Sequence, residues 1–392
     1  MSERWTKEKA WEWYNSRPWI RGFNYVPSDC AGWLEMWQEY DHASKVETIR
    51  RELALAARIG FNAVRQFLAF DVWLYQHDSF MANVEEYISI AAENGLGVML
   101  ALISDGGVPK KEPVFGEVKT TRGVHAGEDN AAPEIPGIFP SERKWEPSMP
   151  IVDPKPKFSP VDEPALAEQF YRYVDELAEK YAKDERVIFW NVWNEPGNSN
   201  RGTLSVPHIR RAFEILRAHD PIQPLAADLW RVPKNNKLTA EETVAAELSD
   251  VISYHDYGSL DHSVRVIEFL RGFGRPMLNT EWLHRVQFNS VYTHLPLYYN
   301  NGIGIFNWGL VEGKFHGKEP WENCWRRYAA GEKLDITKWQ HDLLRANLRP
   351  YDPEEIKKFR LYADMADAAF ARKKQNWMPS ASMLMRRKEH KP

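Results

Sequence analysis

Val187-Ile188-Phe189-Trp190-Asn191-Val192-Trp193-Asn194-Glu195-Pro196-Gly197 is an apolar run that ends abruptly in a carboxylate. The segment Pro276-Met277-Leu278-Asn279-Thr280-Glu281-Trp282 repeats this pattern, with a short apolar run, a glutamate and then an aromatic residue. Short apolar runs of this kind are typical of the buried strands of a parallel sheet. In a closed barrel of strands and helices, the C-terminal ends of all strands open at one face, where catalytic groups lie. We therefore expect Glu195 and Glu281 at that face.

Eight short apolar runs alternate with helical patterns, which is typical of repeated strand and helix units around a parallel sheet. The runs are Ile20–Val26, Ala63–Leu68, Gly97–Ile103, Val187–Val192, Pro224–Asp228, Val251–Tyr254, Met277–Thr280 and Ile303–Trp308. An open doubly wound sheet alternates in the same way, but it normally has fewer strands and often a Gly-rich loop after the first one. Residues 27–33, Pro-Ser-Asp-Cys-Ala-Gly-Trp, lack that pattern. The sequence therefore favours the α/β class and a single (β/α)8 TIM barrel.

Two long loops and a C-terminal helical extension depart from the plain repeat. Residues 105–161, after the third run, are rich in Pro and Gly, and loops of this length are usually functional lids or disordered segments. We expect this loop to build one wall of a cleft, with a second loop, Val311–Leu334, on the same face. We divide the chain into a catalytic barrel, 1–350, and a C-terminal helix with a basic tail, 351–392, packed on the barrel or extending from it. The tail from Arg372 onward is expected to be flexible or docked on the surface, with an oligomer contact as the alternative.

Composition limits the classes of binding partner and the cellular compartment that we expect. A net charge of −4, from 51 basic and 55 acidic residues, argues against nucleic acid or an anionic membrane as a partner. Residues 1–20 lack a signal-peptide pattern, and no segment has the roughly 20 apolar residues that cross a bilayer. The two cysteines, Cys30 and Cys324, fit a reducing compartment, so we expect a soluble cytoplasmic protein. The 17 Trp and 16 Tyr suit sugar rings, but also large cores or the interface of a homo-oligomer, and composition does not decide between these uses.

A pair of carboxylates at strand ends is what hydrolysis of a glycosidic bond requires. One carboxylic acid protonates the leaving oxygen, and in the retaining route an ionised carboxylate about 5–5.5 Å away attacks the anomeric carbon. The structural alternative is that Glu195 caps the turn that follows it, while Glu281 forms an ion pair with Arg285 or Arg65. Because both glutamates end apolar runs, the fourth and the seventh, the catalytic interpretation is favoured.

Further residues carry a resemblance to a known family. The order is an arginine after the second run, an Asn-Glu pair after the fourth, a His-x-Tyr element after the sixth, a glutamate after the seventh and a tryptophan after the eighth. The matching residues are Arg65, Asn194, Glu195, His255, Tyr257, Glu281 and Trp308. In these positions, from about Trp19 to Leu348, the chain resembles glycoside hydrolase family 5. The resemblance implies a retaining barrel glycosidase with Glu195 as acid/base and Glu281 as nucleophile.

Each of the other matched residues has a physical reason for its expected role. Asn194 can donate to the sugar 2-hydroxyl, a contact that strengthens in the transition state. The permanent charge of Arg65 would keep Glu281 ionised and oriented, although a purely structural salt bridge is compatible with that position. Tyr257 could donate to the nucleophile. His255 could hold the acid or a sugar hydroxyl, or could be satisfied structurally.

Trp308, the last of the matched residues, would form the floor under the nonreducing sugar. Other residues near the strand ends are weaker candidates for substrate contact. The family usually has a histidine at the end of strand three, which residues 99–105 lack, so Ser104, Asp105 or another loop must supply that contact. Further candidates on the expected loops are Trp33, Trp37, Asp71, Trp73, Trp282, Glu312 and Lys314, with Trp282 and Lys314 placed first.

The expected substrate is an oligosaccharide. Residues 308–314, with Pro320-Trp321, are similar to the intracellular exo-acting branch of the family (subfamily 18), which includes β-mannosidases acting on mannose-β-1,4-N-acetylglucosamine. Another exo-β-glycosidase, or an endo-β-1,4-glucanase or mannanase, is the alternative within hydrolysis. Outside it stand a catalytically inactive sugar-binding barrel and a barrel isomerase or epimerase. Since the sequence has no His/Cys cluster and no His-Glu-x-x-His pattern, we expect no catalytic metal and no cofactor.

Overall fold

Eight parallel strands form a nearly closed barrel in the computed structural model, which describes residues 3–106, 112–117, 158–231 and 237–377. The strands are β1 (Arg21–Asn24), β2 (Ala63–Phe67), β3 (Gly97–Ala101), β4 (Val187–Trp193), β5 (Leu225–Ala227), β6 (Ile252–His255), β7 (Met277–Trp282) and β8 (Gly304–Asn307). Their order in the sheet is β5-β4-β3-β2-β1-β8-β7-β6, and a bridge between Leu229 and Tyr254 joins the two edges. Each strand matches one expected run to within two residues. The expected TIM barrel is confirmed.

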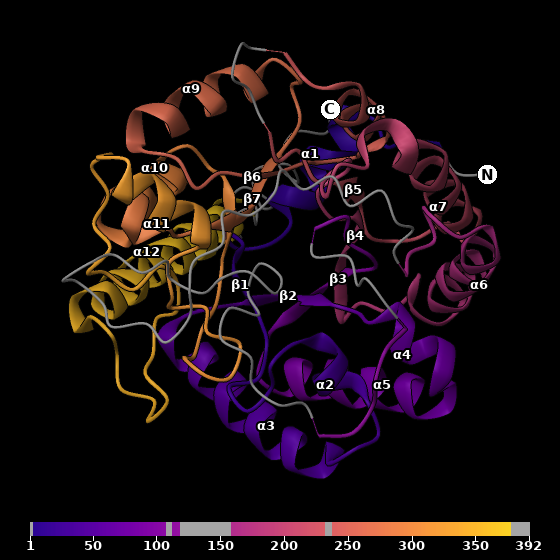
Figure 1. The fold of residues 1–392 in the computed structure, drawn as a ribbon. Helices are drawn as coiled ribbons and strands as arrows, with labels where there is room; N and C mark the ends of the chain where they lie inside the picture. Colours follow the sequence, from indigo (N-terminus) through magenta and orange to yellow (C-terminus); the bar gives the residue numbers. More distant parts are fainter. Residues whose placement is uncertain (1–2, 107–111, 118–157, 232–236, 378–392) are drawn as a thin grey trace, which may run out of the picture.

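A ring of helices surrounds the strands (Figure 1). The helices between successive strands are α3 (His42–Ile59), α5 (His77–Glu93), α6 (Pro164–Tyr181), α7 (Val206–Ala218), α8 (Ala240–Leu248), α9 (Leu260–Arg271) and α10 (Val291–Asn300), and α12 (Pro353–Trp377) follows β8. Additional helices are α1 (Lys7–Asn15), α2 (Trp33–Trp37), α4 (Phe70–Tyr75) and α11 (Glu322–Ala329), with 3-10 turns η1 (Gly202–Ser205) and η2 (Arg285–Gln287). In α6, residues spaced at helical intervals, including Phe170, Val174 and Leu177, are completely buried. This apolar stripe holds α6 against the sheet.

The N-terminal helix α1 packs across the bottom of the barrel. The ring of Trp13 lies 5.9 Å from that of Phe189, which points into the barrel, and both belong to a buried apolar cluster with Phe306. The backbone N–H of Trp5 donates to Asp250 at 2.8 Å, just before β6. Because α1 fills this end with apolar rings, the polar side chains of the barrel gather at the opposite end.

The strand ends at the opposite face are irregular. The pairing register shifts between Asn191 and Trp193 on β4, between Tyr254 and His255 on β6, and between Asn279 and Trp282 on β7. A bulge adds one residue to a strand and redirects the side chains beyond it, and bulges are common beside active sites. These shifts therefore change which side chains after them face the barrel mouth.

The two long loops differ in how far the structure describes them. After β3, residues 107–111 and 118–157 lie outside the described residues, and so does the expected cleft wall for most of its length. After β8, the segment expected to be a loop contains α11, because Trp325 and Cys324 bury an apolar side of that short helix. The expected second loop thus includes one short helix.

Helix α12 forms the expected C-terminal helical extension. Phe359 packs on Phe61 with ring centroids 5.1 Å apart, and Tyr362 packs on Tyr299 of α10 at the same distance. Asp367 accepts a hydrogen bond from Arg21 of β1 at 2.6 Å. Helix α12 thus packs against the barrel, while residues 378–392 of the expected basic tail lie outside the described residues. The domain boundary at residue 350 stays an interpretation.

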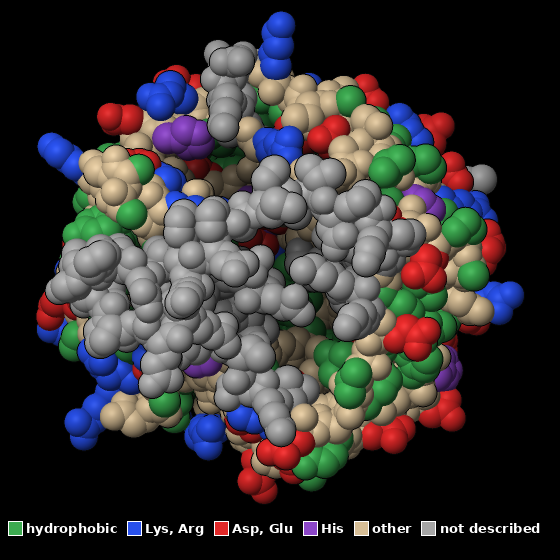
Figure 2. Space-filling view, in the orientation of Figure 1, with side chains coloured by type: hydrophobic (Ala, Val, Ile, Leu, Met, Phe, Trp, Pro, Cys, Tyr) green, Lys and Arg blue, Asp and Glu red, His purple; other side chains and the backbone are tan. Residues whose placement is uncertain are grey.

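The described helices are not suited to cross a membrane. None of them combines the length and the hydropathy that a membrane span requires. Around the described rim of the face in Figure 2, basic and acidic side chains are interspersed, as the nearly even charge balance indicates.

Candidate active site

The C-terminal strand ends bring together residues that are far apart in the sequence. Arg65 lies on β2, Glu195 follows β4, His255 ends β6 and Glu281 lies on β7. A carboxylate oxygen of Glu195, a ring nitrogen of His255 and a carboxylate oxygen of Glu281 all lie within 4.8 Å of one another. The two glutamates expected at one face therefore meet at the barrel mouth.

Two side chains donate hydrogen bonds to Glu281, and His255 lies close to it. Arg65 Nη1 donates to its Oε1 at 2.8 Å, and the Tyr257 hydroxyl donates to its Oε2 at 2.9 Å. His255 Nε2 lies 3.4 Å from Oε1, and the Glu281 side chain is only 6% exposed. Burial raises the pKa of Glu281, while His255 and Arg65 oppose this rise by favouring the ionised form.

Glu195 lies in a more open position, with 17% of its side chain exposed. His255 Nδ1 approaches its Oε1 at 2.9 Å, and Asn198 Nδ2 donates to its Oε2 at 2.5 Å. Its backbone has φ 49°, in the left-handed region that residues other than glycine seldom adopt. Strained backbone of this kind often occurs at functional sites, where the surrounding fold enforces it.

Arg65 is fully buried beneath the two glutamates and hydrogen-bonds to several side chains at once. Its two terminal nitrogens donate to side-chain oxygens from four other strands. The acceptors are Asn24, Glu281, Asn191, Asn194 and Asp228, at distances between 2.5 and 2.9 Å. The guanidinium geometry suits several acceptors at once, which a lysine could not satisfy.

Asn194 is fixed in orientation by its neighbours. Its Oδ1 accepts from Arg65, and its Nδ2 donates to Ser104 Oγ at 2.7 Å. Ser104 therefore lies beside the site, at the strand end where the family usually has a histidine. Asp105 faces away from the mouth, since its Oδ2 accepts from Gly197 N and Ser205 Oγ, and it is 1% exposed. Of the two residues suggested for that contact, only Ser104 remains.

Trp308 belongs to an aromatic wall on one side of the site. Its ring lies 6.0 Å from Phe67, 6.3 Å from Trp33 and 6.4 Å from Phe315, and the residue is 7% exposed. Trp33, one of the weaker candidates, thus joins the wall. Stacked and edge-on aromatic rings of this kind give a rigid apolar surface.

Several weaker candidates are not at the mouth. Trp282 was placed first among them, but its side chain is completely buried against Tyr298 and Phe359, at 5.3 and 6.3 Å. Strand β7 continues through Trp282, and consecutive residues of a strand point to opposite sides, so inward Glu281 places Trp282 outward. That expectation is corrected. Trp37 and Trp73 are likewise buried in packing contacts, with Phe80 and Tyr173 respectively.

The charged weaker candidates form ion pairs in the structure. Lys314 Nζ lies 3.1 Å from Glu35 Oε1, and Glu312 pairs with Lys318. Lys314 therefore makes its described charge contact with Glu35 and not with the two glutamates of the mouth.

Sequence reasoning missed the polar layer directly beneath the mouth. Asn24, Asn191, Asp228, Ser253 and Thr280 are all buried there and hydrogen-bonded to one another or to Arg65. Asp228 ends the fifth apolar run, which is the same signal that marked Glu195 and Glu281. Polar residues inside otherwise apolar runs were the available sign of this layer.

The cluster of Glu195, His255 and Glu281 could in principle hold a cation, since its ligand atoms lie close together. Burial lowers the affinity of His255 for its proton, but Glu281 and Asp228 outweigh that effect and raise its pKa to about 10. At neutral pH both ring nitrogens then carry hydrogens, with Nδ1 donating to Glu195 and Nε2 facing Glu281 and Asp228. The cluster thus fits a proton-holding site better than a metal site, and the expected lack of a metal and a cofactor stays a prediction.

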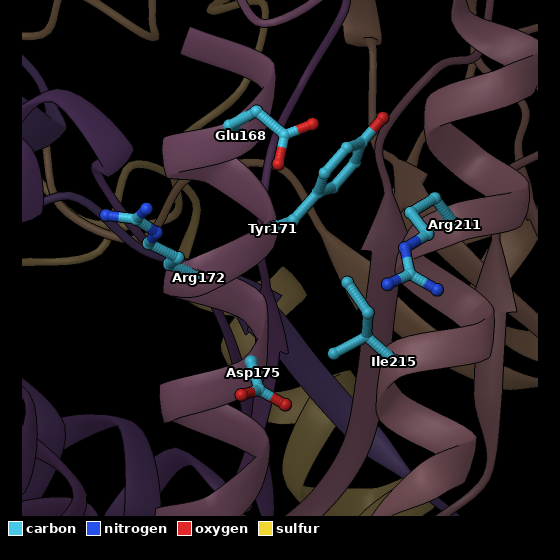
Figure 3. A pocket seen from close by; sticks show the side chains of 6 residues that line it. All are labelled: Glu168, Tyr171, Arg172, Asp175, Arg211 and Ile215. Carbon is cyan, nitrogen blue, oxygen red and sulfur yellow. The ribbon is translucent and has the colours of Figure 1, made fainter. Parts of the chain in front are cut away.

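A second hollow lies on the outer flank of the barrel, between α6 and α7. It has a volume of about 350 Å³ and is lined by Glu168, Tyr171, Arg172, Asp175, Arg211 and Ile215 (Figure 3). Two of its charged residues form ion pairs, Asp175 with His219 and Arg211 with Glu214. We assign no function to it.

The fold and the two carboxylates at its mouth define a barrel glycoside hydrolase. The family model described as Cellulase (glycosyl hydrolase family 5) matches residues 34–340. The chain therefore belongs to glycosyl hydrolase family 5 and is a glycoside hydrolase, as its resemblance to that family indicated. No curated protein matches the sequence.

Solved structures with the same fold include proteins named for mannosides. An exo-β-1,4-mannosidase from Opitutaceae bacterium strain TAV5 has a TM-score of 0.55 at 16% identity, over 91% of this chain and 60% of that one. A subfamily-18 protein from Streptomyces cattleya, in complex with Manβ1-4GlcNAc, has a TM-score of 0.55 at 14% identity, over 93% and 82%. A β-glucosidase has a TM-score of 0.52 at 11% identity, over 88% and 98%. At these identities the likeness shows the fold alone, and the chain covers 60% of the Opitutaceae protein, less than two thirds of its length.

Proposed function

We propose that this protein is a retaining β-glycosidase, with Glu281 as nucleophile and Glu195 as general acid and base. The main support for this proposal is the proximity of the two glutamates, whose carboxylate oxygens lie within 4.8 Å of each other. Retaining enzymes hold the two carboxyl groups about 5–5.5 Å apart, whereas inverting enzymes need about 6.5–9.5 Å to admit a water. The spacing supports direct attack by Glu281.

The reaction then proceeds by double displacement. A Glu281 oxygen bonds to the anomeric carbon while the bond to the leaving oxygen breaks, and that oxygen takes the proton of Glu195. Glu195, now ionised, removes a proton from water, whose oxygen attacks the same carbon and releases Glu281. Two inversions restore the original anomeric configuration.

Neighbouring side chains prepare both steps. Arg65 and Tyr257 donate to Glu281 and hold it ionised with an oxygen free to attack. Asn194 uses one amide hydrogen for Ser104, and we assign its second hydrogen to the 2-hydroxyl of the sugar. Trp308 provides an apolar surface for the nonreducing sugar.

For the substrate, we propose a β-mannoside at the nonreducing end of a short oligosaccharide, such as mannose-β-1,4-N-acetylglucosamine. Two observations support this choice: the segment from Trp308 to Lys314, and the shared fold with proteins named as an exo-β-1,4-mannosidase and as a complex with Manβ1-4GlcNAc. The alternatives are another exo-β-glycosidase, an endo-β-1,4-glucanase or mannanase, and a sugar-binding barrel without activity. The presence of both glutamates counts against the last of these.

A substrate panel separates these possibilities. Purified protein is incubated with aryl β-mannoside, β-glucoside, β-galactoside and β-xyloside, then with mannose-β-1,4-N-acetylglucosamine and longer β-mannans. We expect the highest kcat/KM for the mannoside and release of single mannose units. A preference for another glycoside moves the substrate assignment to that sugar. Internal cleavage of polymers contradicts exo action, and the absence of turnover on every substrate contradicts the proposal that the protein is an active glycosidase.

Proton NMR of the first product tests the mechanism. The β-anomer should form first and then mutarotate, whereas an initial α-anomer contradicts double displacement. Glu281→Gln should abolish turnover because it removes the nucleophile, while Glu214→Gln, at a half-exposed position on α7, serves as the matched control and should leave turnover unchanged.

A further inference from the structure

Asp228 is a buried carboxylate below the two glutamates that the proposed reaction does not use. It follows β5, is completely buried, and accepts hydrogen bonds from four strands. Its donors are Arg65 Nη2 at 2.9 Å, Asn191 Nδ2 at 2.8 Å, Thr280 Oγ1 at 3.0 Å and Ser253 Oγ. These donors compensate the cost of burying the charge of Asp228.

The charges around Asp228 nearly balance when it is ionised. Arg65 lies against it and against Glu281, and His255 Nε2 lies 3.5 Å from its Oδ2. Burial disfavours the ionised form, but Arg65 and His255 outweigh burial and hold the pKa of Asp228 well below its usual range. Asp228 is thus negatively charged at neutral pH.

His255 connects Asp228 to the proposed acid. Its Nδ1 faces Glu195 at 2.9 Å, while its Nε2 faces Glu281 at 3.4 Å and Asp228 at 3.5 Å. The other titratable group in contact with these carboxylates is Tyr257, which donates to Glu281. Asp228 is the member of this set that lies too deep to touch a sugar.

We propose that Asp228 is a positioning residue that orients Arg65 toward Glu281 and keeps His255 as an imidazolium donating to Glu195. The proposal rests on the proposed glycosidase function and adds a part of the machinery that the pattern of matched residues does not include. Asp228 acts through Arg65 and His255 and makes no contact with the reacting atoms.

Neutralising Asp228 should move the alkaline limb of the pH profile in one direction, toward lower pH. Asp228→Asn keeps the shape but removes the negative charge that lies against Arg65 and His255. Without this negative neighbour, His255 should deprotonate at lower pH. We expect this change to move the alkaline limb of the kcat/KM profile to lower pH.

The test compares pH profiles for hydrolysis of the best aryl β-glycoside by wild type and Asp228→Asn. We expect kcat to fall roughly 10- to 100-fold with little change in KM, because positioning is lost. The alkaline limb should move down by about one pH unit or more. The matched control is Asp250→Asn, a buried aspartate that pairs with Arg217 at 2.8 Å at the opposite end of the barrel. It should lower thermal stability without moving the limb.

Two further measurements test the proposal if no substrate is known or if Asp228→Asn does not fold. NMR titration of histidine-labelled protein follows the His255 ring without any turnover, and in Asp228→Asn it should titrate at lower pH even if no substrate has been found. If Asp228→Asn does not fold, Ser253→Ala removes one donor to Asp228 while keeping its charge. That charge is then less neutralised, so the His255 ring should titrate at slightly higher pH than in the wild type. Unchanged profiles and an unchanged His255 titration in a folded variant, or an equal shift in Asp250→Asn, overturn the proposal.

Discussion

Glu195 and Glu281 carry the same chemical group in different surroundings. Glu281 is 6% exposed and receives hydrogen bonds from Arg65 and Tyr257, whereas Glu195 is 17% exposed and lies against His255 and Asn198. A carboxylate held on both oxygens suits the oriented nucleophile, and a more open one suits exchange of a proton with the leaving group and with water. The surroundings thus support different roles for the two residues.

Replacement of the proposed acid should discriminate between leaving groups. Glu195→Ala removes proton delivery, so kcat/KM for aryl glycosides with poor leaving groups should fall by about 10²–10⁴-fold. Activated leaving groups, which depart without a proton, should lose far less. Rates measured across a series of substituted phenols provide the comparison, and equal losses throughout the series reject the acid assignment.

Removal of the Tyr257 hydroxyl should change the acid side of the pH profile. Burial already raises the pKa of Glu281, and Tyr257→Phe takes away a donor that stabilises its ionised form. The acid limb of kcat/KM, which reports ionisation of the nucleophile, should therefore move to higher pH by about one unit.

A matched tyrosine provides the control for that shift. Tyr173→Phe removes a buried hydroxyl that donates to the Leu102 carbonyl outside the site, at 3.0 Å. Its acid limb should coincide with that of the wild type. An unmoved limb in Tyr257→Phe contradicts the role of Tyr257.

At the scale of elements, stability and chemistry lie at opposite ends of the barrel. Helix α1 packs its rings across the lower end, where Trp13 contacts Phe189. The register shifts of β4, β6 and β7 lie at the upper end, near Asn194, His255 and Glu281. Dense apolar packing at the lower end therefore supports the irregular strand ends at the upper end.

Truncation within α1 should lower stability while sparing catalysis. Trp13→Ala empties a nearly buried position and should cost about 3–5 kcal/mol of unfolding free energy. Turnover of the folded variant should stay near that of the wild type. Trp11→Ala, at a 39% exposed position of the same helix, is the control and should cost less than about 1 kcal/mol. Thermal melting and specific activity together check both statements, and a loss of activity in folded Trp13→Ala contradicts the separation.

At the scale of the whole molecule, one buried carboxyl group links stability to pH. Asp342 is 3% exposed in the segment after β8, and its Oδ2 has no hydrogen-bond partner among the described residues. Burial raises its pKa from 3.8 to about 7, although Arg285 opposes the rise. An unfolded chain has lost this proton above about pH 4, while the folded chain keeps it to about pH 7. Stability should therefore fall as the pH rises through that window.

Asp342→Asn should relieve this dependence. An asparagine carries no charge and tolerates the left-handed backbone at this position, where φ is 47°. At pH 8 the variant should be more stable than wild type by on the order of 2 kcal/mol, and the difference should shrink toward pH 5. Melting temperatures at the two pH values test this, with Asp364→Asn on the exposed side of α12 as control. A gain of equal size at pH 5 and pH 8 contradicts the explanation.

The strands and the two central glutamates were predictable because their signals are local. An apolar run of five or six residues bounded by turn residues identifies a strand without knowledge of its neighbours, and a carboxylate at its end identifies the face. All eight strands, and the meeting of Arg65, Glu195, His255 and Glu281 at one mouth, agree with those signals.

Side-chain direction and deep partners depended on the folded barrel. Trp282 turns outward because β7 extends through it after a register shift, and that shift occurs in the pairing with β8, a contact that forms only in the folded barrel. Asp228 acquires its donors from four strands that meet only when the barrel closes. Local apolar patterns thus define the elements and the pair of carboxylates, whereas pairing between distant strands sets which side chains surround them, because those contacts exist only after closure.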